Sequence, residues 1–144
     1  MLVIGVLGCT AVVTMAQTSG KGNTKLEHGK YLVNQVGLCA DCHSPRDQKG
    51  EFIKEKWLEG APIMFSPSIE IPWAGTAPPL AGLEGWTDAE AMKFLTTGID
   101  KDGKNARPPM PPYRFSESDA SAVLAYLRSL KQPAASQKSA KQGQ

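Results

Sequence analysis

The chain has 144 residues, with 16 basic and 14 acidic side chains, three cysteines and two histidines. This length predicts one compact domain and excludes a two-domain enzyme, and a formal charge of +2 without a cluster of positive residues argues against a nucleic-acid-binding protein. Twelve of the first sixteen residues are hydrophobic, so the rest of the chain has few apolar side chains for a core. Something other than side chains must therefore help to fill the interior.

The chain begins with an uncharged apolar run, Met1 to Ala16, which is too short for a transmembrane helix of about 20 residues. The run is typical of a secretory signal peptide, and the small residues Thr14 and Ala16 favour cleavage before Gln17. Two alternatives stay open, a lipid attached to Cys9 and an uncleaved N-terminal anchor. All three predict export, to the periplasm or to the outer face of the cytoplasmic membrane.

The polar segments at the two ends of the remaining chain are expected to lie outside the folded domain. Residues 17–23 are predicted to be a leader or tether. Residues 132–144 contain no large apolar side chain that would offset the entropy of ordering them, which predicts a disordered tail. The folded domain is therefore expected over residues 24–131.

The first helix is predicted to begin at Thr24, because Thr24 and Glu27 have the spacing of a capping box. Apolar residues at helical spacing follow, and Gly37 is the expected stop. His28 lies on this helix, where a solvated position on the helix face is the expected outcome.

The pentapeptide Cys39-Ala40-Asp41-Cys42-His43 is the attachment motif of c-type haem. Two thiols one helical turn apart can form thioethers to the two vinyl groups of one macrocycle. The histidine that follows can then place its imidazole under the ring and bind the iron. The motif therefore predicts one haem c, bonded through Cys39 and Cys42 and ligated by His43.

Three other uses of the cysteine pair have weaker support. A disulfide redox site needs a thioredoxin-like βαβ context, which the sequence pattern lacks. A zinc site needs a second pair of ligands, yet His28 and His43 are the only histidines of the chain. A structural disulfide between Cys39 and Cys42 is compatible with export but leaves the lean core unexplained.

Residues 43–86 are predicted to be mostly loop, since they hold six of the eleven prolines and five glycines. Only residues 51–56 or 69–71 have the composition of a short extended piece. Loops of this length in a compact domain are usually functional or wrap around something.

The second helix is expected to begin at Thr87, paired with Glu90, and to end at Gly98, with Met92 on its apolar face. The third is expected to begin at Ser116, and its apolar residues recur at positions 120, 123, 124, 127 and 130. That stripe is typical of a helix buried on one side.

Between these helices lies a stiff proline run, residues 108–112, with Met110 in its middle. A thioether sulfur at the sixth position of haem iron raises the redox potential and closes the iron to small molecules. Met110 is the predicted ligand, Met64 is the second choice, and His28 is discounted.

These stretches together resemble a class I c-type cytochrome over residues 24–131, and above all the cytochrome domains of bacterial membrane-bound dehydrogenase electron-transfer subunits. The matching stretches are residues 29–33, 39–47, 85–90, 109–111 and 125–130. The resemblance implies an all-α, cytochrome c-like fold of three to four helices around one covalently bound haem, with long Pro/Gly-rich loops. A single copy of the haem motif implies one haem.

The resemblance also implies roles for individual residues. The first and last helices would cross at close approach, with Gly29 on one side and Tyr126 on the other. Trp86 would border the haem and donate its indole N–H to a propionate, although covering the start of the second helix is an equal alternative.

Several polar groups complete the expected site. A backbone carbonyl from the loop after His43 should accept the other ring N–H of that histidine, and Pro62 and Pro67 are the candidates. Tyr113 needs a hydroxyl partner if it is buried. The arginines are expected to be solvated rather than paired with propionates: Arg46, Arg107 and Arg114.

With His43 and Met110 both on the iron, no position is open for a substrate. The prediction is a monohaem electron-transfer cytochrome of a respiratory chain, not an enzyme. Its redox partners would be a dehydrogenase or quinol-oxidising complex and a terminal oxidase or reductase. The first alternative is a haem enzyme or gas-binding sensor with a labile or absent Met110 ligand, and the second is a structural or redox module without haem.

Overall fold

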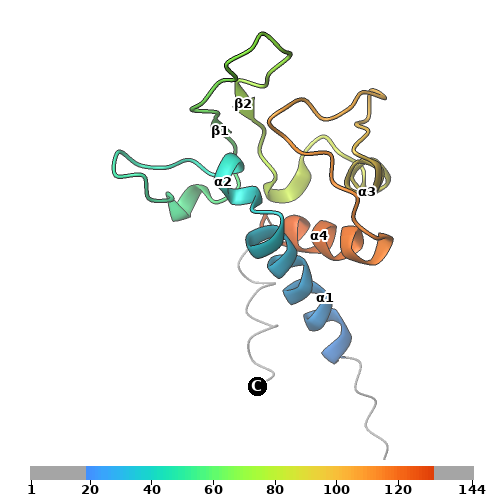
Figure 1. Cartoon of the computed structure of the whole chain (residues 1–144). Coiled ribbons are helices and arrows are strands. Elements are labelled where there is room, and N and C mark those ends of the chain that lie inside the picture. Colours follow the sequence, from blue (N-terminus) through green and yellow to red (C-terminus); the bar gives the residue numbers. More distant parts are fainter. Residues whose placement is uncertain (1–18, 132–144) are drawn as a thin grey trace, which may run out of the picture.

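The computed structural model describes residues 19–131 of the chain (Figure 1). The predicted signal peptide, the lipidation candidate Cys9 and the predicted tail over residues 132–144 lie outside the described residues. The described elements, in chain order, are helix α1 (Ser19–Tyr31), the π-helical turn η1 (Leu32–Val36), helix α2 (Cys39–His43), the 3-10 turn η2 (Lys54–Lys56), strands β1 (Ala61–Pro62) and β2 (Thr76–Ala77), the 3-10 turn η3 (Ala81–Leu83), and helices α3 (Asp88–Thr97) and α4 (Glu117–Ser129).

The predicted all-α architecture is confirmed. Among the described residues the only paired strands are β1 and β2, an antiparallel pair in which Ala61 faces Ala77 and Pro62 faces Thr76. Within the same range no helix is both long enough and apolar enough to cross a membrane.

Helices α1 and α4 cross at Gly29, as the resemblance implied. A Cβ atom at Gly29 would lie 1.9 Å from the carbonyl oxygen of Ala122 and 3.0 Å from Cβ of Tyr126. The backbone of α4 therefore comes closer to Gly29 than the tyrosine side chain does. Polar contacts flank the crossing, since Lys25 Nζ donates to Ser121 Oγ over 2.6 Å.

The predicted start of the first helix was wrong. Thr24 lies inside α1, which begins five residues earlier at Ser19 and so includes part of the predicted leader. The capping-box pattern at Thr24 and Glu27 does not decide the boundary, because local cap preferences are weak compared with tertiary context. The predicted stop at Gly37 is confirmed: its N–H closes η1 on the carbonyl of Leu32 over 2.7 Å.

The other two predicted helices are confirmed with their caps. The Thr87 side chain accepts from the N–H of Glu90, and the Glu90 carboxylate accepts from the N–H of Thr87, so α3 has a complete capping box. Gly98 closes α3 with a φ of +74°, a conformation that favours glycine. Ser116 caps α4 by accepting from the N–H of Asp119.

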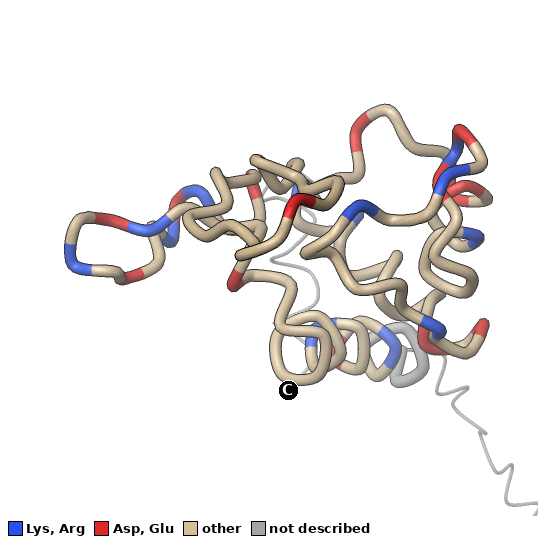
Figure 2. Tube along the Cα trace, turned by 45° about the horizontal axis from the view of Figure 1, so that its top comes forward, with Lys and Arg blue, Asp and Glu red and all other residues tan. Residues whose placement is uncertain are grey.

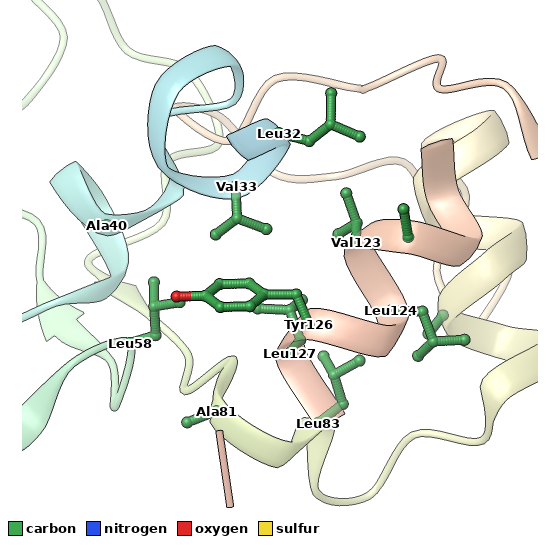
Figure 3. Close-up of a cluster of buried hydrophobic side chains, with 12 residues drawn as sticks. Leu32, Val33, Ala40, Leu58, Ala81, Leu83, Val123, Leu124, Tyr126 and Leu127 are labelled. Carbon is green, nitrogen blue, oxygen red and sulfur yellow. The ribbon is translucent and has the colours of Figure 1, made fainter. Parts of the chain in front are cut away.

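The core lies where α4 meets η1 and the loops after α2 (Figure 3). The Tyr126 ring lies among Val33, Leu58 and Leu127. Met92 packs against this cluster half-buried, as predicted. The other buried apolar side chains of the cluster are Leu32, Ala40, Ala81, Leu83, Ala91, Ala122, Val123 and Leu124.

The prediction of loop over residues 43–86 is largely confirmed, but neither suggested extended piece forms a strand. Phe52 pairs only as an isolated bridge with Arg46, and Lys54–Lys56 forms the turn η2. The two strands lie instead at β1 and β2, on either side of residues 63–75.

Candidate cofactor site

The cysteine pair lies on α2, which begins directly after Leu38 in a left-handed conformation with a φ of +49°. Cys39 and Cys42 are both half-buried free thiols. Burial raises the pKa of Cys39 to about 11, and the nearby Cys42 adds to the effect. A thiol-disulfide exchange site has the opposite property, a lowered thiol pKa, so the raised pKa of Cys39 argues against that use of the pair.

The imidazole of His43 is buried and held by one hydrogen bond. Its Nδ1–H donates to the carbonyl oxygen of Pro78 over 2.7 Å, because a carbonyl can only accept. Burial lowers the pKa of His43, against the opposing effect of the Pro78 carbonyl. The ring is therefore neutral at pH 7 with its proton on Nδ1, which leaves the Nε2 lone pair available for a metal ion.

The carbonyl that orients His43 was predicted wrongly. It belongs to Pro78, not to Pro62 or Pro67. The N–H of Gly60 donates to the His43 carbonyl over 2.8 Å, and the pairing of β1 with β2 then brings the residue that follows β2 beside the imidazole. Sequence spacing alone does not show which side of this hairpin faces the histidine.

Cys39, Cys42 and His43 line a cavity of about 760 Å³ together with Met110. This volume falls within the range of roughly 300 to 1,000 Å³ that is usual for small-molecule and cofactor sites. Much of the wall is apolar, and η1, η3, α3 and α4 all contribute to it, including Leu32, Val33, Leu83, Phe94, Leu95 and Val123. Many of the few apolar side chains expected from the composition therefore line this cavity.

Met110 is fixed in the proline run by two backbone contacts. Its own N–H donates to the carbonyl of Arg107 over 3.1 Å, and the N–H of Ala74 donates to the carbonyl of Pro108 over 2.7 Å. The half-buried Met110 lines the cavity. Met64, the second candidate, is 87% exposed and does not line it.

Tyr113 joins the loop after Met110 to the turn before α2. Its hydroxyl donates to the carbonyl of Gly37, and its ring stacks on Phe115 with centroids 5.0 Å apart. Burial raises the pKa of Tyr113 to about 12, with a smaller contribution from the cysteine pair. The expected hydroxyl partner is therefore a backbone carbonyl.

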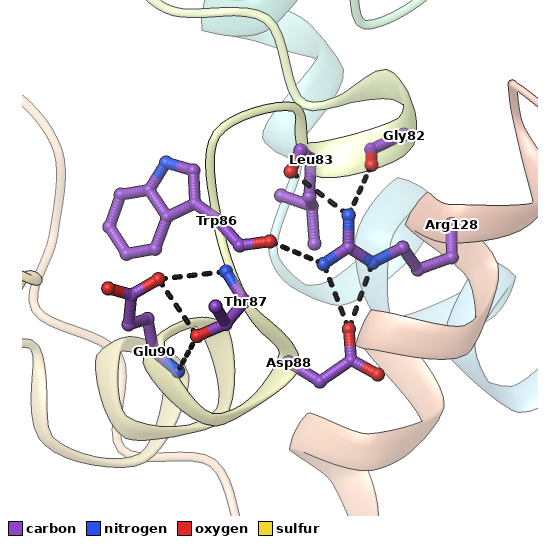
Figure 4. Close-up of polar contacts among 7 residues, drawn as sticks. All are labelled: Gly82, Leu83, Trp86, Thr87, Asp88, Glu90 and Arg128. Atoms are coloured by element: carbon purple, nitrogen blue, oxygen red, sulfur yellow. Dashed lines mark hydrogen bonds and ion pairs between the residues drawn. The ribbon is translucent and has the colours of Figure 1, made fainter.

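Trp86 is half-buried at the cavity wall and immediately precedes the capped start of α3. Figure 4 shows the guanidinium of Arg128 beside this turn: it donates to the Trp86 carbonyl over 2.6 Å and to the Gly82 carbonyl over 2.6 Å. It also contacts the carboxylate of Asp88 at 2.8 Å. The sequence analysis did not identify Arg128. Its position beside the apolar stripe of the last helix was a signal that could have indicated a structural role.

The three arginines that were expected to be solvated are exposed, as predicted. Arg107 lies at the cavity, while Arg114 donates to the carbonyls of Pro112 and Tyr113. Arg46 lies 3.7 Å from the centre of the Phe52 ring and contacts Asp41. His28, also predicted on a solvated face, is half-exposed and hydrogen-bonds to the Asp119 carboxylate at 2.7 Å.

The residues at the cavity fit a covalently bound haem. Two free thiols, a neutral imidazole nitrogen and a thioether sulfur at one apolar cavity are the groups that c-type haem requires. Cys39 and Cys42 would hold the macrocycle, and His43 and Met110 would hold its iron.

Comparisons with known proteins agree with this chemistry. The family model described as Cytochrome c matches residues 26–131. The chain is 30% identical over 115 residues to the fructose dehydrogenase cytochrome subunit of Gluconobacter japonicus, covering 75% of this chain and 22% of that protein. It is 31% identical over 117 residues to the cytochrome c subunit of the quinone alcohol dehydrogenase of Gluconacetobacter polyoxogenes, covering 74% and 24%.

A third relative, a diheme cytochrome c-type protein of Cereibacter sphaeroides, is 30% identical over 108 residues, which cover 71% of this chain and 34% of that protein. The chain thus matches about a fifth to a third of the length of these relatives. Since the family model covers nearly all of the described residues, the match and the motif-bearing cavity lead to one conclusion: the chain belongs to the cytochrome c family.

Proposed function

We propose that this protein is a monohaem c-type cytochrome that carries single electrons and is not an enzyme. One haem c is bonded through Cys39 and Cys42, and its iron is ligated by His43 and Met110. The observation that carries the proposal is the gathering of these four side chains at one apolar cavity.

Each residue has a defined task in this arrangement. When bound, the haem supplies reversible one-electron exchange at its iron. The Pro78 carbonyl fixes the ring orientation and tautomer of His43, and the proline run holds Met110 at the cavity without helical support. The apolar wall keeps water from the site and thereby influences its potential. Trp86 borders the haem at the cavity wall.

With His43 and Met110 both holding the iron, no position would remain for a substrate, which favours a carrier over an enzyme. The alternative, a haem enzyme or gas-binding sensor, requires a labile Met110 and polar groups that can move protons. His28, the spare histidine, is held at the surface by Asp119, which supports the carrier.

The redox partners that we propose are protein complexes. The relatives that are named as cytochrome subunits of dehydrogenases support a dehydrogenase or quinol-oxidising complex as the electron donor. A terminal oxidase or reductase is the proposed acceptor. The apolar run of residues 1–16 supports placement in the periplasm or on the outer face of the cytoplasmic membrane, with a tether if Cys9 is lipidated or the anchor is retained.

An optical spectrum of the purified protein tests this function. A carrier with two protein ligands gives sharp ferrous bands that do not shift when carbon monoxide is added. Ready binding of carbon monoxide would assign the protein to the enzyme or sensor class instead. A protein that shows no haem stain after denaturing electrophoresis would overturn both haem functions.

A further inference from the structure

Residues 63–75, which we name the apolar arm, extend away from the helices between β1 and β2 (Figure 1). The arm exposes large apolar side chains: Met64 is 87% exposed, Ile69 67% and Phe65 57%. Single exposed apolar residues are ordinary, but a group of them on one projecting segment usually marks an interaction surface.

The arm is held in a defined shape by its own contacts. The Trp73 indole donates to the carbonyl of Phe65 over 3.1 Å, and the two rings meet edge to face with centroids 5.7 Å apart. The N–H of Ile63 donates to the carbonyl of Gly75 over 3.0 Å and closes the base of the arm. Trp73 therefore makes its contacts within the arm, whereas Met64 and Ile69 face outward.

The base of the arm belongs to the cofactor site. Ile63, Pro72 and Ala74 line the cavity, and Ala74 is hydrogen-bonded to Pro108, two residues before Met110. A partner that covers the arm would therefore lie beside the wall of the haem cavity, close enough to the cofactor for its position to matter in electron transfer.

The charge of the arm and of the sequence on either side of it indicates which kind of partner it fits. From residue 57 to residue 92 the sequence has five acidic residues and no Lys or Arg, and Glu70 is the single charged residue of the arm. Segments that insert into anionic membrane surfaces carry Lys and Arg beside their apolar residues, and this segment would be repelled. The neighbouring loop over residues 46–56 differs, with mixed blue and red segments in Figure 2, where the arm is almost entirely tan.

We propose that the apolar arm is the docking surface for the electron-donating subunit of a dehydrogenase, a proposal that rests on the proposed function. The partner surface would be an apolar patch with a basic group opposite Glu70, the single charged residue of the arm. Met and aromatic side chains are enriched in the cores of protein interfaces, whereas Lys and Glu are depleted there. The contact is thus of the kind made by a lasting subunit interface rather than by a brief encounter.

Site-specific photo-crosslinking in cells of the native host tests this proposal directly. With the photoreactive residue benzoylphenylalanine in place of Ile69, we expect a covalent adduct that mass spectrometry identifies as a dehydrogenase subunit. The same residue in place of Lys49, on the charged neighbouring loop, is the matched control and should give no such adduct. Adducts of the Ile69 position only with lipid, only with a second copy of this chain, or with no molecule would overturn the proposal.

A second experiment measures electron transfer from the captured subunit, purified and supplied with its own substrate. The double variant Met64→Ser, Ile69→Ser should slow haem reduction about tenfold or more, the loss typical of interface anchors. The variant Lys49→Ser, Lys54→Ser should not. An unchanged rate in a double variant with a normal haem spectrum overturns the docking proposal alone, whereas a wild-type protein without haem overturns the proposed function.

Discussion

At the residue scale, the site depends on how the chain positions the two side chains that we propose as iron ligands. Burial keeps the imidazole of His43 neutral, and the Pro78 carbonyl holds its proton on Nδ1. Met110 has no helix to position it and relies on backbone contacts of Pro108 and Arg107. The two proposed ligands are thus positioned by different means, one by a hydrogen bond to the side chain and the other by a stiff backbone.

Replacing the proposed sulfur ligand gives the first prediction. Met110→Ala should lower the midpoint potential by on the order of 0.1 V or more, within the roughly 0.8 V range that axial ligands set. The variant should also bind carbon monoxide while its haem remains covalently attached. Potentiometric titration and the carbon monoxide difference spectrum measure both effects. Met64→Ala is the control, and if it produced these changes in place of Met110→Ala the ligand assignment would be wrong.

The residues of the site differ in how far sequence could predict them. Cys39, Cys42 and His43 form a local motif, and Met110 stands out in its proline run, so all four could be proposed without a structure. The Pro78 carbonyl and Arg128 act across 35 and 42 residues of chain, respectively, on His43 and Trp86. Such contacts depend on the path of a long loop, and local spacing does not encode that path.

At the scale of elements, the crossing of α1 and α4 depends on the absence of a side chain at Gly29. An alanine there gains about 1 kcal/mol of helix propensity, but its Cβ would lie 1.9 Å from the Ala122 carbonyl oxygen. Because that oxygen belongs to helical backbone and cannot rotate away, the helices must separate. The clash therefore exceeds the gain in propensity.

We accordingly predict that Gly29→Ala lowers the free energy of unfolding by about 3 kcal/mol, the upper part of the usual overpacking range. Chemical denaturation followed by circular dichroism measures the change. Gly75→Ala is the matched control, because no atom lies within 4 Å of a Cβ at that position. Equal stability of the two variants would contradict the close crossing.

Arg128 joins α4 to η3 and to the start of α3. Its guanidinium satisfies the carbonyls of Gly82, Leu83 and Trp86 and contacts Asp88. Hydrogen bonds to charged groups contribute about 1.5–3 kcal/mol each, and some of the lost bonds are replaced by water because the side chain is 31% exposed. Arg128→Met should therefore lower the free energy of unfolding by about 2–4 kcal/mol.

Urea denaturation of the haem-loaded protein, followed by circular dichroism, measures this cost. The control is Arg114→Met, since Arg114 donates only to the neighbouring carbonyls of its own loop; its cost should stay below about 1 kcal/mol. A loss in Arg128→Met no larger than in this control would contradict the linking role.

The N-terminus of α4 provides an acid-sensitive contact with α1. Hydrogen bonds from His28 and then from Ser116 hold the pKa of Asp119 below its usual value of 3.8. A lowered folded-state pKa means that the contribution to stability is present above the unfolded pKa and is lost as the pH falls through the folded one. Between about pH 5 and pH 3, wild-type thermal midpoints should fall more steeply than those of Asp119→Asn. If the thermal midpoints of the wild type and of Asp119→Asn fell equally over this pH range, the result would contradict this contact.

The elements show where local sequence determines structure and where it does not. Caps at Thr87 and Ser116 and the stop at Gly98 correspond to the observed ends of α3 and α4. At α1 the same kind of pattern failed, because the helix begins at Ser19 and Thr24 lies inside it. The short strands were misplaced as well, since two-residue strands carry too little periodicity to be recognised.

At the scale of the whole molecule, the described helices and loops surround a cavity that lies beside a small hydrophobic core. The composition anticipated this, since the chain outside the first sixteen residues is poor in hydrophobic residues for its length. A bound macrocycle would bury apolar surface that the side chains alone leave open, at about 25 cal/mol per Å². Haem attachment and folding should therefore be coupled, and Cys39→Ala combined with Cys42→Ala should lose both colour and stable structure.

The apolar arm adds a second property of the whole molecule, an exposed surface joined to the cavity wall. This surface bears on which of two roles the protein has, that of a freely diffusing carrier or that of a subunit that stays bound to its dehydrogenase. The exposure of Ile69 and the absence of Lys and Arg from residues 57–92 are consistent with the second role.

The most direct test of the central claim is the intact mass of the protein, purified from a host that is competent for cytochrome c maturation. We predict a single species whose mass exceeds that of its polypeptide by one haem, with Cys39 and Cys42 both unavailable to thiol reagents. A mass equal to that of the bare polypeptide, with both thiols reactive, would contradict the account.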